Sequence, residues 1–158
     1  MYKERFFRLL YDMYACVKSV VRQGVDMSQV IEQMVGLRQG CILSPCLFSI
    51  FIADLPRVLR EQGPRGVQVG DVWLQVLLYA DDGALLAESS DDLQRMLDVL
   101  KVYCGRWRMF VNLPKTKLVV FNRSVNEWGW RFFYDGHPIE GGLEQNSKVV
   151  RAALSLNV

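Results

Sequence analysis

The stretch Tyr79-Ala80-Asp81-Asp82-Gly83 places two adjacent acidic residues between two of the most apolar runs of the chain. Residues 72–78 before it and residues 84–87 after it are largely apolar. Asp-Gly between two such runs is the strongest short-range signal for a β-hairpin, because glycine supplies the positive φ of a tight turn. We therefore expect Asp81 and Asp82 at the tip of a hairpin.

This acid pair suggests a metal site. Adjacent carboxylates repel each other and lose hydration when both flanks are buried, and a bound cation relieves both costs. Mg²⁺ takes oxygen ligands and is usually held by one or two carboxylates together with substrate phosphates. Neighbouring side chains point to opposite faces of a straight strand but converge at a turn. The alternative is that Asp-Asp-Gly is only a solvated turn in which Asp hydrogen-bonds the local backbone.

Composition fits a chain with a substantial core. The 158 residues are 51% hydrophobic, which suits one domain or a large part of one. No apolar run has the length of a membrane span and the first residues lack a secretory signal, so we expect an intracellular protein without a membrane partner. A net charge of +2 does not by itself indicate nucleic-acid binding. The cysteines lack Cys-x-x-Cys spacing and are expected to be buried thiols: Cys16, Cys41, Cys46 and Cys104.

Hydrophobic periodicity and turn residues predict an α+β fold, with an antiparallel sheet backed by helices. Ser44-Pro45 is typical of a helix start and predicts one deeply packed helix from Cys46 to about Leu59, which Pro56 bends. Ser89 and the acids after it predict the start of a regular helix that reaches Trp107. The other expected elements are an amphipathic helix from Tyr2 to about Tyr14, a hairpin of strands at 17–22 and 29–34, strands at 117–121 and 128–134, and a turn at Asp135-Gly136 after the last of these.

Positive charge gathers between Asp98 and Glu127, where the sequence contains no acidic residue. Aromatic side chains are interleaved with the basic ones, which is typical of surfaces that bind nucleotides or single strands. An equally good interpretation is a helix and a strand whose apolar faces are core and whose basic faces are solvated. The basic residues are Lys101, Arg106, Arg108, Lys115, Lys117 and Arg123, and the aromatic residues are Tyr103, Trp107, Phe110 and Phe121.

Three segments in order resemble the palm of a reverse transcriptase of the non-LTR, or LINE-type, retrotransposon group. They are Gly-Leu-Arg-Gln-Gly-Cys-Ile-Leu-Ser-Pro-Cys-Leu-Phe at 36–48, Tyr-Ala-Asp-Asp at 79–82, and Asn-Leu-Pro-Lys-Thr-Lys at 112–117. The resemblance extends over roughly residues 11–121. It implies an RNA-directed DNA polymerase that performs two-metal nucleotidyl transfer on an RNA template, a DNA primer and a dNTP.

The resemblance also implies roles for individual residues. Asp81 would be a catalytic ligand of two Mg²⁺ ions, with Asp82 as a weaker or supporting ligand. The residues that the resemblance places near the incoming nucleotide and the template are Arg38, Gln39, Gly40, Tyr79 and Lys115. Arg106, Arg108 and Lys117 would contact the nucleic-acid backbone.

The family pattern also contains an earlier strand with an aspartate in a Phe-x-Asp pattern, and Asp54, Asp71 and Asp135 do not match it. We therefore expect residues 1–140 to be a truncated palm without fingers or first catalytic strand, and residues 141–158 to be a tail of uncertain structure. That truncation predicts an unpaired sheet edge beside the acid hairpin. The isolated chain is expected to be inactive unless another chain supplies the missing parts. The alternatives are a non-catalytic remnant that binds RNA or a protein, and a truncated reading frame without a selected role.

Overall fold

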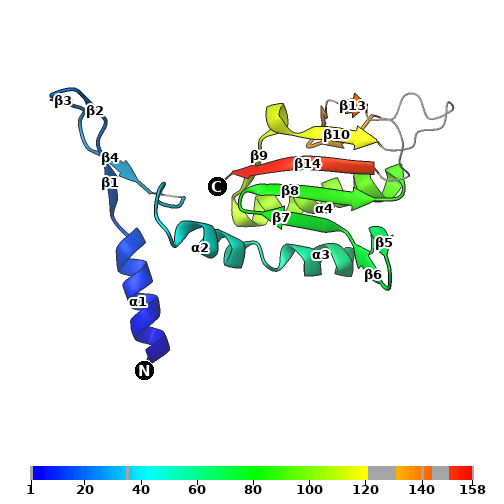
Figure 1. Ribbon diagram of the computed structural model, residues 1–158, viewed down its shortest axis with the longest axis horizontal. Helices are drawn as coiled ribbons and strands as arrows, with labels where there is room; N and C mark the ends of the chain where they lie inside the picture. Colours follow the sequence, from blue (N-terminus) through cyan, green and yellow to red (C-terminus); the bar gives the residue numbers. More distant parts are fainter. Residues whose placement is uncertain (1, 35, 121–130, 140, 144–149, 158) are drawn as a thin grey trace. The chain divides into compact units, whose positions relative to one another are not determined.

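A computed structural model of the chain describes residues 2–34, 36–120, 131–139, 141–143 and 150–157 (Figure 1). The chain divides into two compact units, one comprising the residues up to Leu47 and the other Phe48–Asn157. Within the described residues, no helix combines the length and apolarity that crossing a membrane requires. The predicted α+β class is confirmed at this level, because helices and small, mostly antiparallel sheets alternate along the chain.

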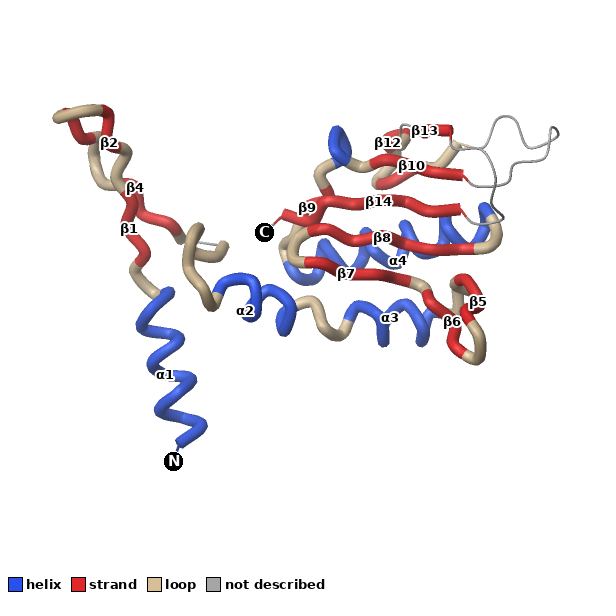
Figure 2. The backbone as a smooth tube through the Cα atoms, in the orientation of Figure 1, coloured by secondary structure: helices blue, strands red, loops and turns tan. Residues whose placement is uncertain are grey.

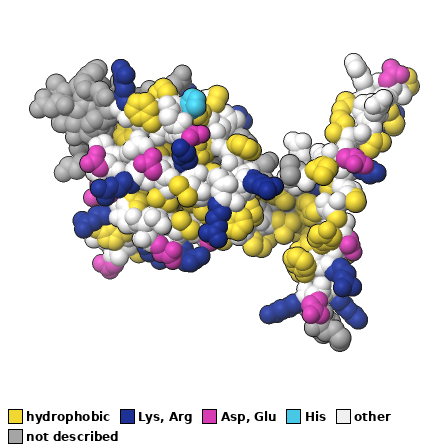
Figure 3. Space-filling model, turned by 180° about the vertical axis from the view of Figure 1, so that it is seen from behind, with side chains coloured by type: hydrophobic (Ala, Val, Ile, Leu, Met, Phe, Trp, Pro, Cys, Tyr) yellow, Lys and Arg dark blue, Asp and Glu magenta, His cyan; other side chains and the backbone are white. Residues whose placement is uncertain are grey.

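The first unit consists of a helix and an extended hairpin. The helix α1 (Tyr2–Tyr14) confirms the predicted amphipathic helix. In the hairpin, β1 (Val17–Ser19) pairs with β4 (Ile31–Gln33), and β2 (Arg22–Gln23) pairs with β3 (Asp26–Met27) around Gly24. Apolar side chains remain at the surface of this unit (Figure 3), and the large exposed ones include Phe6, Phe7, Leu9, Val25, Met27 and Met34.

The predicted single helix from Cys46 to Leu59 is wrong, because the chain forms two shorter helices. They are α2 (Ser44–Phe51), which crosses from the first unit into the second, and α3 (Leu55–Gln62). Pro56 explains the break: its ring has no N–H to donate and would clash with the carbonyl of Ile52 in a continuous helix. Deep packing is confirmed for Ile52 and wrong for Ile50, which is 66% exposed.

The second unit is organised on a sheet whose described strands follow the order β13-β10-β14-β8-β7, with β9 also pairing with β14 (Figure 2). Neighbouring strands are antiparallel except for β10 and β13, which are parallel. The strands are β7 (Val76–Tyr79), β8 (Asp82–Ala87), β9 (Phe110–Val111), β10 (Lys117–Val120), β13 (Gly141–Leu143) and β14 (Val150–Asn157).

The long helix α4 (Ser90–Trp107) lies along this sheet (Figure 2) and carries much of the core. Ser89 caps it as predicted, since its hydroxyl accepts the backbone N–H of Asp92 at 3.1 Å. The fully buried side chains include Leu93, Met96, Leu97 and Leu100 of α4, Leu85 of β8, and Leu55 and Leu59 of α3. Each such side chain contributes about 1.5–3 kcal/mol relative to an exposed position, so these residues hold α3, α4 and the sheet together.

Three short elements surround the sheet. The hairpin of β5 (Val67–Val69) and β6 (Val72–Leu74) precedes β7. The 3-10 turn η1 (Leu113–Lys115) separates β9 from β10. The hairpin of β11 (Phe133–Tyr134) and β12 (His137–Pro138) turns at the predicted Asp135-Gly136, while the strand expected at 128–134 is reduced to its last two residues within the described part. Residues 121–130 lie outside the described residues.

Two further expectations are corrected. Cys104 is buried and Cys41 partly so, but Cys16 and Cys46 are exposed, since α2 and the segment after α1 leave these positions at the surface. The edge of β8 is paired with β14 along its whole length, so the expectation is wrong for this strand. An unpaired edge does lie beside the acid pair at β7, which is the terminal strand in the described order of this sheet. Val76 and Leu78 of β7 are partly buried against the core.

Candidate functional site

The acid pair lies at a tight connection between β7 and β8. Tyr79 pairs with Asp82, so only Ala80 and Asp81 connect the two strands. The positive φ of this connection belongs to Ala80, at 50°, whereas Gly83 lies within β8 opposite Leu78. The expectation that Gly83 supplies the positive φ is therefore wrong. Asp81 and Asp82 are exposed.

The carboxy-terminal strand β14 runs beside the acid pair. Ser155 lies opposite Asp82 on one side of β14, and Ala153 lies opposite Lys117 on the other side. The segment between β9 and β10, residues 112–116, therefore leaves the sheet at the end where the acid pair lies (Figure 2). Neighbouring strands are about 4.8 Å apart. Because β14 lies between β8 and β10, these two strands are about 10 Å apart across the sheet.

The turn that carries Lys115 is well ordered by its own contacts. The Asn112 side chain accepts the backbone N–H of Lys115 at 3.3 Å, which caps η1. Thr116 is fully buried, and its hydroxyl donates to the backbone carbonyl of Asn112 at 2.9 Å. Lys115 and Lys117 flank this buried threonine and are both exposed. The turn therefore presents two cationic side chains to solvent from a fixed backbone.

The carboxy-terminal end of α4 reaches the same end of the sheet. β8 leads away from the acid pair, and α4 then returns over about 27 Å for its 18 residues (Figure 2). Arg108 ends the helix in the left-handed region with a φ of 54°, and the Arg106 guanidinium lies 5.7 Å from the centre of the Trp107 ring. Both arginines are exposed. One end of the sheet thus combines the acid pair with four basic side chains: Arg106, Arg108, Lys115 and Lys117.

The glutamine-glycine segment belongs to the first unit, where Arg38, Gln39 and Gly40 are exposed. Gly40 has a φ of 77°, which favours glycine. The hydroxyl of the largely buried Ser44 donates to the backbone carbonyl of Arg38 at 2.8 Å and lies 3.2 Å from the Tyr14 hydroxyl, so it fastens this loop instead of capping α2. The Tyr14 hydroxyl also donates to the Cys41 sulfur, and this hydrogen bond lowers the pKa of that thiol.

The acid pair has the donor chemistry of a Mg²⁺ site. Two exposed carboxylates on adjacent residues offer only oxygen ligands and leave room for the waters that Mg²⁺ retains. Among the residues that the structure describes, no three His, Cys, Asp or Glu side chains gather as metal ligands. The described acids near the turn are therefore a pair, not a complete cage.

A second polar surface was missed by the sequence reasoning. Arg60, Arg65 and Trp73 line a pocket beside the β5–β6 hairpin. They come from α3, from the following loop and from β6, and share no motif. The only local signal was the loop Gly63-Pro64-Arg65-Gly66 that joins these elements.

Comparison with known proteins gives a consistent result. The family model "Reverse transcriptase (RNA-dependent DNA polymerase)" matches residues 4–146. The RNA-directed DNA polymerase from mobile element jockey of Drosophila funebris is 33% identical over 98 residues, which cover 58% of this chain and 10% of that protein. The probable RNA-directed DNA polymerase from transposon BS of Drosophila melanogaster is 36% identical over 103 residues, covering 61% and 10%.

A vertebrate protein extends this set of relatives. The transposon TX1 uncharacterized 149 kDa protein of Xenopus laevis is 30% identical over 114 residues, which cover 71% of this chain and 9% of that protein. The chain thus spans about a tenth of the length of the curated relatives it matches. No solved structure gives a significant match. The predicted resemblance to non-LTR reverse transcriptases is confirmed, and the chain belongs to the reverse transcriptase family.

Proposed function

We propose that the second unit is the part of a polymerase palm that presents catalytic acids for RNA-directed DNA synthesis. The observation that carries the proposal is the register of β7 and β8, which exposes Asp81 and Asp82 at the sheet end that also carries Lys115. Acids that hold divalent ions and cations that neutralise phosphates are the two requirements of phosphoryl transfer. The proposed partners are an RNA template, a DNA primer and a dNTP, which places the reaction inside the cell.

Each residue of this site has a proposed part. Asp81 is the principal ligand of Mg²⁺ and Asp82 a supporting one. Bound Mg²⁺ cancels negative charge on the attacking hydroxyl and the leaving pyrophosphate. Lys115 supplies a compact positive charge for the nucleotide phosphates. Arg106, Arg108 and Lys117 contact the nucleic-acid backbone, and Tyr79 contacts the nucleotide or template. Arg38, Gln39 and Gly40 belong to the first unit, and we propose them separately as contacts of nucleotide and template.

We also propose that these 158 residues do not polymerise by themselves. Two carboxylates are too few to hold two divalent ions firmly, because most ligands would then be water or substrate. A further acid, from another segment or another chain, completes the site in this proposal. Loss of one member of a catalytic group typically costs several orders of magnitude in rate.

A chimeric polymerase tests whether the acid pair supports catalysis when the remaining parts of a polymerase are supplied. The jockey polymerase of Drosophila funebris is made with its corresponding segment replaced by residues 4–146 of this chain. The expected result is Mg²⁺-dependent extension of a DNA primer on an RNA template, lowered about 100-fold or more by Asp81→Asn. Asp26→Asn, an exposed acid of β3, is the matched control and leaves extension unchanged.

Two results contradict the proposal. One is a folded chimera that binds primer and template but does not extend them while the parent polymerase does. The other is an Asp81→Asn chimera that extends at the rate of the unsubstituted one. Extension by the isolated 158-residue chain, abolished by Asp81→Asn, contradicts only the claim of inactivity.

A second candidate function rests on the exposed basic residues of the same sheet end. A remnant that binds RNA without chemistry would need Arg106, Arg108 and Lys115 but not the acids. Salt-dependent RNA binding by the isolated chain that is unaffected by Mg²⁺ and by Asp81→Asn, together with an inactive chimera, favours this candidate.

A further inference from the structure

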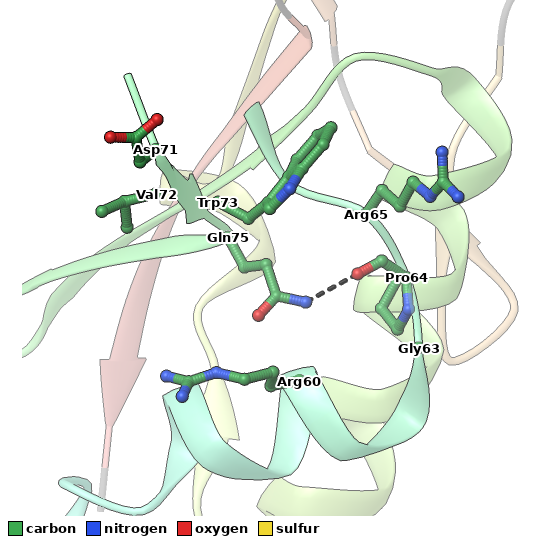
Figure 4. A pocket seen from close by; sticks show the side chains of 9 residues that line it. Arg60, Gly63, Pro64, Arg65, Asp71, Val72, Trp73 and Gln75 are labelled. Carbon is green, nitrogen blue, oxygen red and sulfur yellow. Dashed lines mark hydrogen bonds between the residues drawn. The ribbon is translucent and has the colours of Figure 1, made fainter. Parts of the chain in front are cut away.

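A pocket of about 600 Å³ lies at the end of β7 opposite to the acid pair. The carboxy-terminal part of α3, the loop after it and the β5–β6 hairpin form the walls of this open pocket (Figure 4). Its volume falls within the range of small-ligand sites. The lining includes Arg60, Pro64, Arg65, Asp71, Trp73 and Gln75.

Hydrogen bonds between side chains and the backbone fix the walls of this pocket. Gln75 Nε2 donates to the carbonyl of Pro64 at 2.6 Å, which ties the hairpin to the loop. The backbone N–H of Arg65 donates to Asp92 Oδ1 at 3.1 Å, which ties the same loop to the first turn of α4. Gly66 lies so close to β6 that a Cβ atom would be 2.2 Å from the Leu74 carbonyl oxygen. The pocket is therefore a built feature whose loop cannot shift freely.

The side chains that face it combine positive charge with an aromatic surface. Arg60 and Arg65 are exposed, and neither makes an ion pair within 4 Å of another described residue, although the charge of Arg65 acts on Asp92 and lowers the pKa of that carboxyl. Trp73 is 47% exposed, an unusual position for so large an apolar side chain. Figure 4 shows the Trp73 ring on the side of the pocket near Arg65, with the Asp71 carboxylate at the far side.

These groups match the chemistry of one nucleotide unit. A guanidinium donates in a planar fork that fits phosphate oxygens, and it stays charged at all relevant pH values. A half-exposed indole offers a face on which a nucleobase stacks, and such stacking tolerates any base. An isolated anion would need no aromatic wall, and an apolar ligand would need no arginine beside it.

We propose that this pocket binds a nucleotide, with its base stacked on Trp73 and its phosphate near the Arg65 guanidinium, while Arg60, on the other side of the Gln75–Pro64 hydrogen bond (Figure 4), adds positive charge to the rim. The site is separate from the acid pair and does not rest on the proposed polymerase function. A free nucleotide and one unit of a single strand share this chemistry. Asp71 opposes the phosphate from the rim, so its charge sets a limit on the affinity.

The test uses the whole chain and isothermal calorimetry. The probes are adenosine, inorganic phosphate, adenosine monophosphate and a short oligoadenylate. Adenosine monophosphate is expected to bind more tightly than adenosine or phosphate, and to quench tryptophan fluorescence in the parent chain but not in Trp73→Phe. Tighter binding of the oligoadenylate identifies a strand as the natural source, and equal binding identifies a free nucleotide.

Single substitutions test which residues form the nucleotide site. Trp73→Ala is expected to weaken binding about 5- to 150-fold through lost stacking. Arg60→Ala is expected to lower the salt slope for the oligoadenylate by about 0.7. Arg57→Ala is the matched control, because Arg57 lies one turn away on α3 and is paired with Glu61. Asp71→Asn is expected to strengthen binding. Circular dichroism of each variant confirms the fold.

Three results among the variants and probes overturn the proposal, and a fourth is the complete absence of binding by every probe. The first three are inorganic phosphate binding as tightly as adenosine monophosphate, a folded Trp73→Ala chain that binds as the parent does, and an equal loss in Arg57→Ala and Arg60→Ala.

Discussion

The Tyr103 hydroxyl donates a 2.5 Å hydrogen bond to Asp54 Oδ1, joining the carboxy-terminal part of α4 to the residue that precedes α3. Burial raises the pKa of Tyr103, and the hydrogen bond to the Asp54 carboxylate raises it further. Asp54 lies at the break between α2 and α3, where the chain changes direction. The hydrogen bond between Tyr103 and Asp54 therefore fixes the start of α3 relative to α4.

Tyr103→Phe removes this donor and leaves the Asp54 carboxylate without it. The expected loss in the free energy of unfolding is about 1–3 kcal/mol, because a partly buried charged acceptor loses its partner. Urea denaturation measures it. Asp54→Asn keeps an acceptor at the same place and is expected to lose less. Equal stability of Tyr103→Phe and the parent chain contradicts a structural role for the contact.

The cap of α4 makes stability depend on pH. Burial of Asp92 opposes its charged form, but the Ser89 hydroxyl, the Arg65 N–H and the charges of Arg95 and Arg65 outweigh it and lower the pKa. Because the pKa of Asp92 is lower in the folded state, its contribution to the free energy of unfolding is complete above the unfolded pKa. This contribution is lost as the pH falls through the folded pKa.

Asp92→Asn is therefore expected to be less stable than the parent by about 1 kcal/mol at pH 7. The difference should persist down to the unfolded pKa of Asp, about 3.9, and shrink below it, because the folded carboxyl with its lowered pKa takes up its proton at a lower pH. Urea denaturation across this range measures it, with Asp91→Asn as the neighbouring exposed control. A difference that stays constant down to acidic pH would show that the charge of Asp92 has no part in the cap.

Ala80 and Asp81 form the connection between β7 and β8, the acid turn. Ala80 adopts a left-handed backbone conformation there that L-residues rarely adopt. The conformation costs about 1–2 kcal/mol for a residue with a Cβ, while glycine adds about 0.5–1 kcal/mol of backbone entropy to the unfolded chain. Ala80→Gly is thus expected to stabilise the second unit slightly, by about 0.5–1 kcal/mol, in thermal or urea unfolding. Ala84→Gly, in the regular part of β8, is expected to destabilise it. A loss of the same size in both variants contradicts the register of Tyr79 with Asp82.

Local signals in the sequence predicted the local structure well. Ser89 and Asp92 identified the start of α4 because a cap is formed by residues three positions apart. The turn of Asp135 and Gly136 was found for the same reason. Pro56 was recognised as a perturbation, but whether a proline bends a helix or divides it depends on the packing of Ile52 and Leu55, which is a tertiary matter.

The position of the acid turn shows where local rules fail. Asp-Gly predicted a turn centred on Gly83, but strand register is set by which residues of both strands reach the core, and this places Ala80 at the positive φ. The pocket of Arg60, Arg65 and Trp73 could not be predicted at all, because its members come from three elements. The position of β14 in the sheet could not be predicted either. Its partner β8 lies more than sixty positions earlier along the chain, and its partner β10 lies about thirty positions earlier.

Strand β14 holds the acid end of the sheet together, because Ala153 lies between Ala84 of β8 and Lys117 of β10. Ala153→Pro removes one backbone N–H from this inner strand and is expected to cost about 1–3 kcal/mol or more, since one ladder hydrogen bond is lost and the proline ring disturbs the pairing on that side. Ala153→Ser keeps the N–H and serves as the control. Urea denaturation and hydrogen exchange at β8 and β10 measure the effect, with faster exchange expected in the strand that accepts the Ala153 N–H. If the proline and serine variants were equally stable, β14 would not be the strand that covers the edge of β8 beside Asp82.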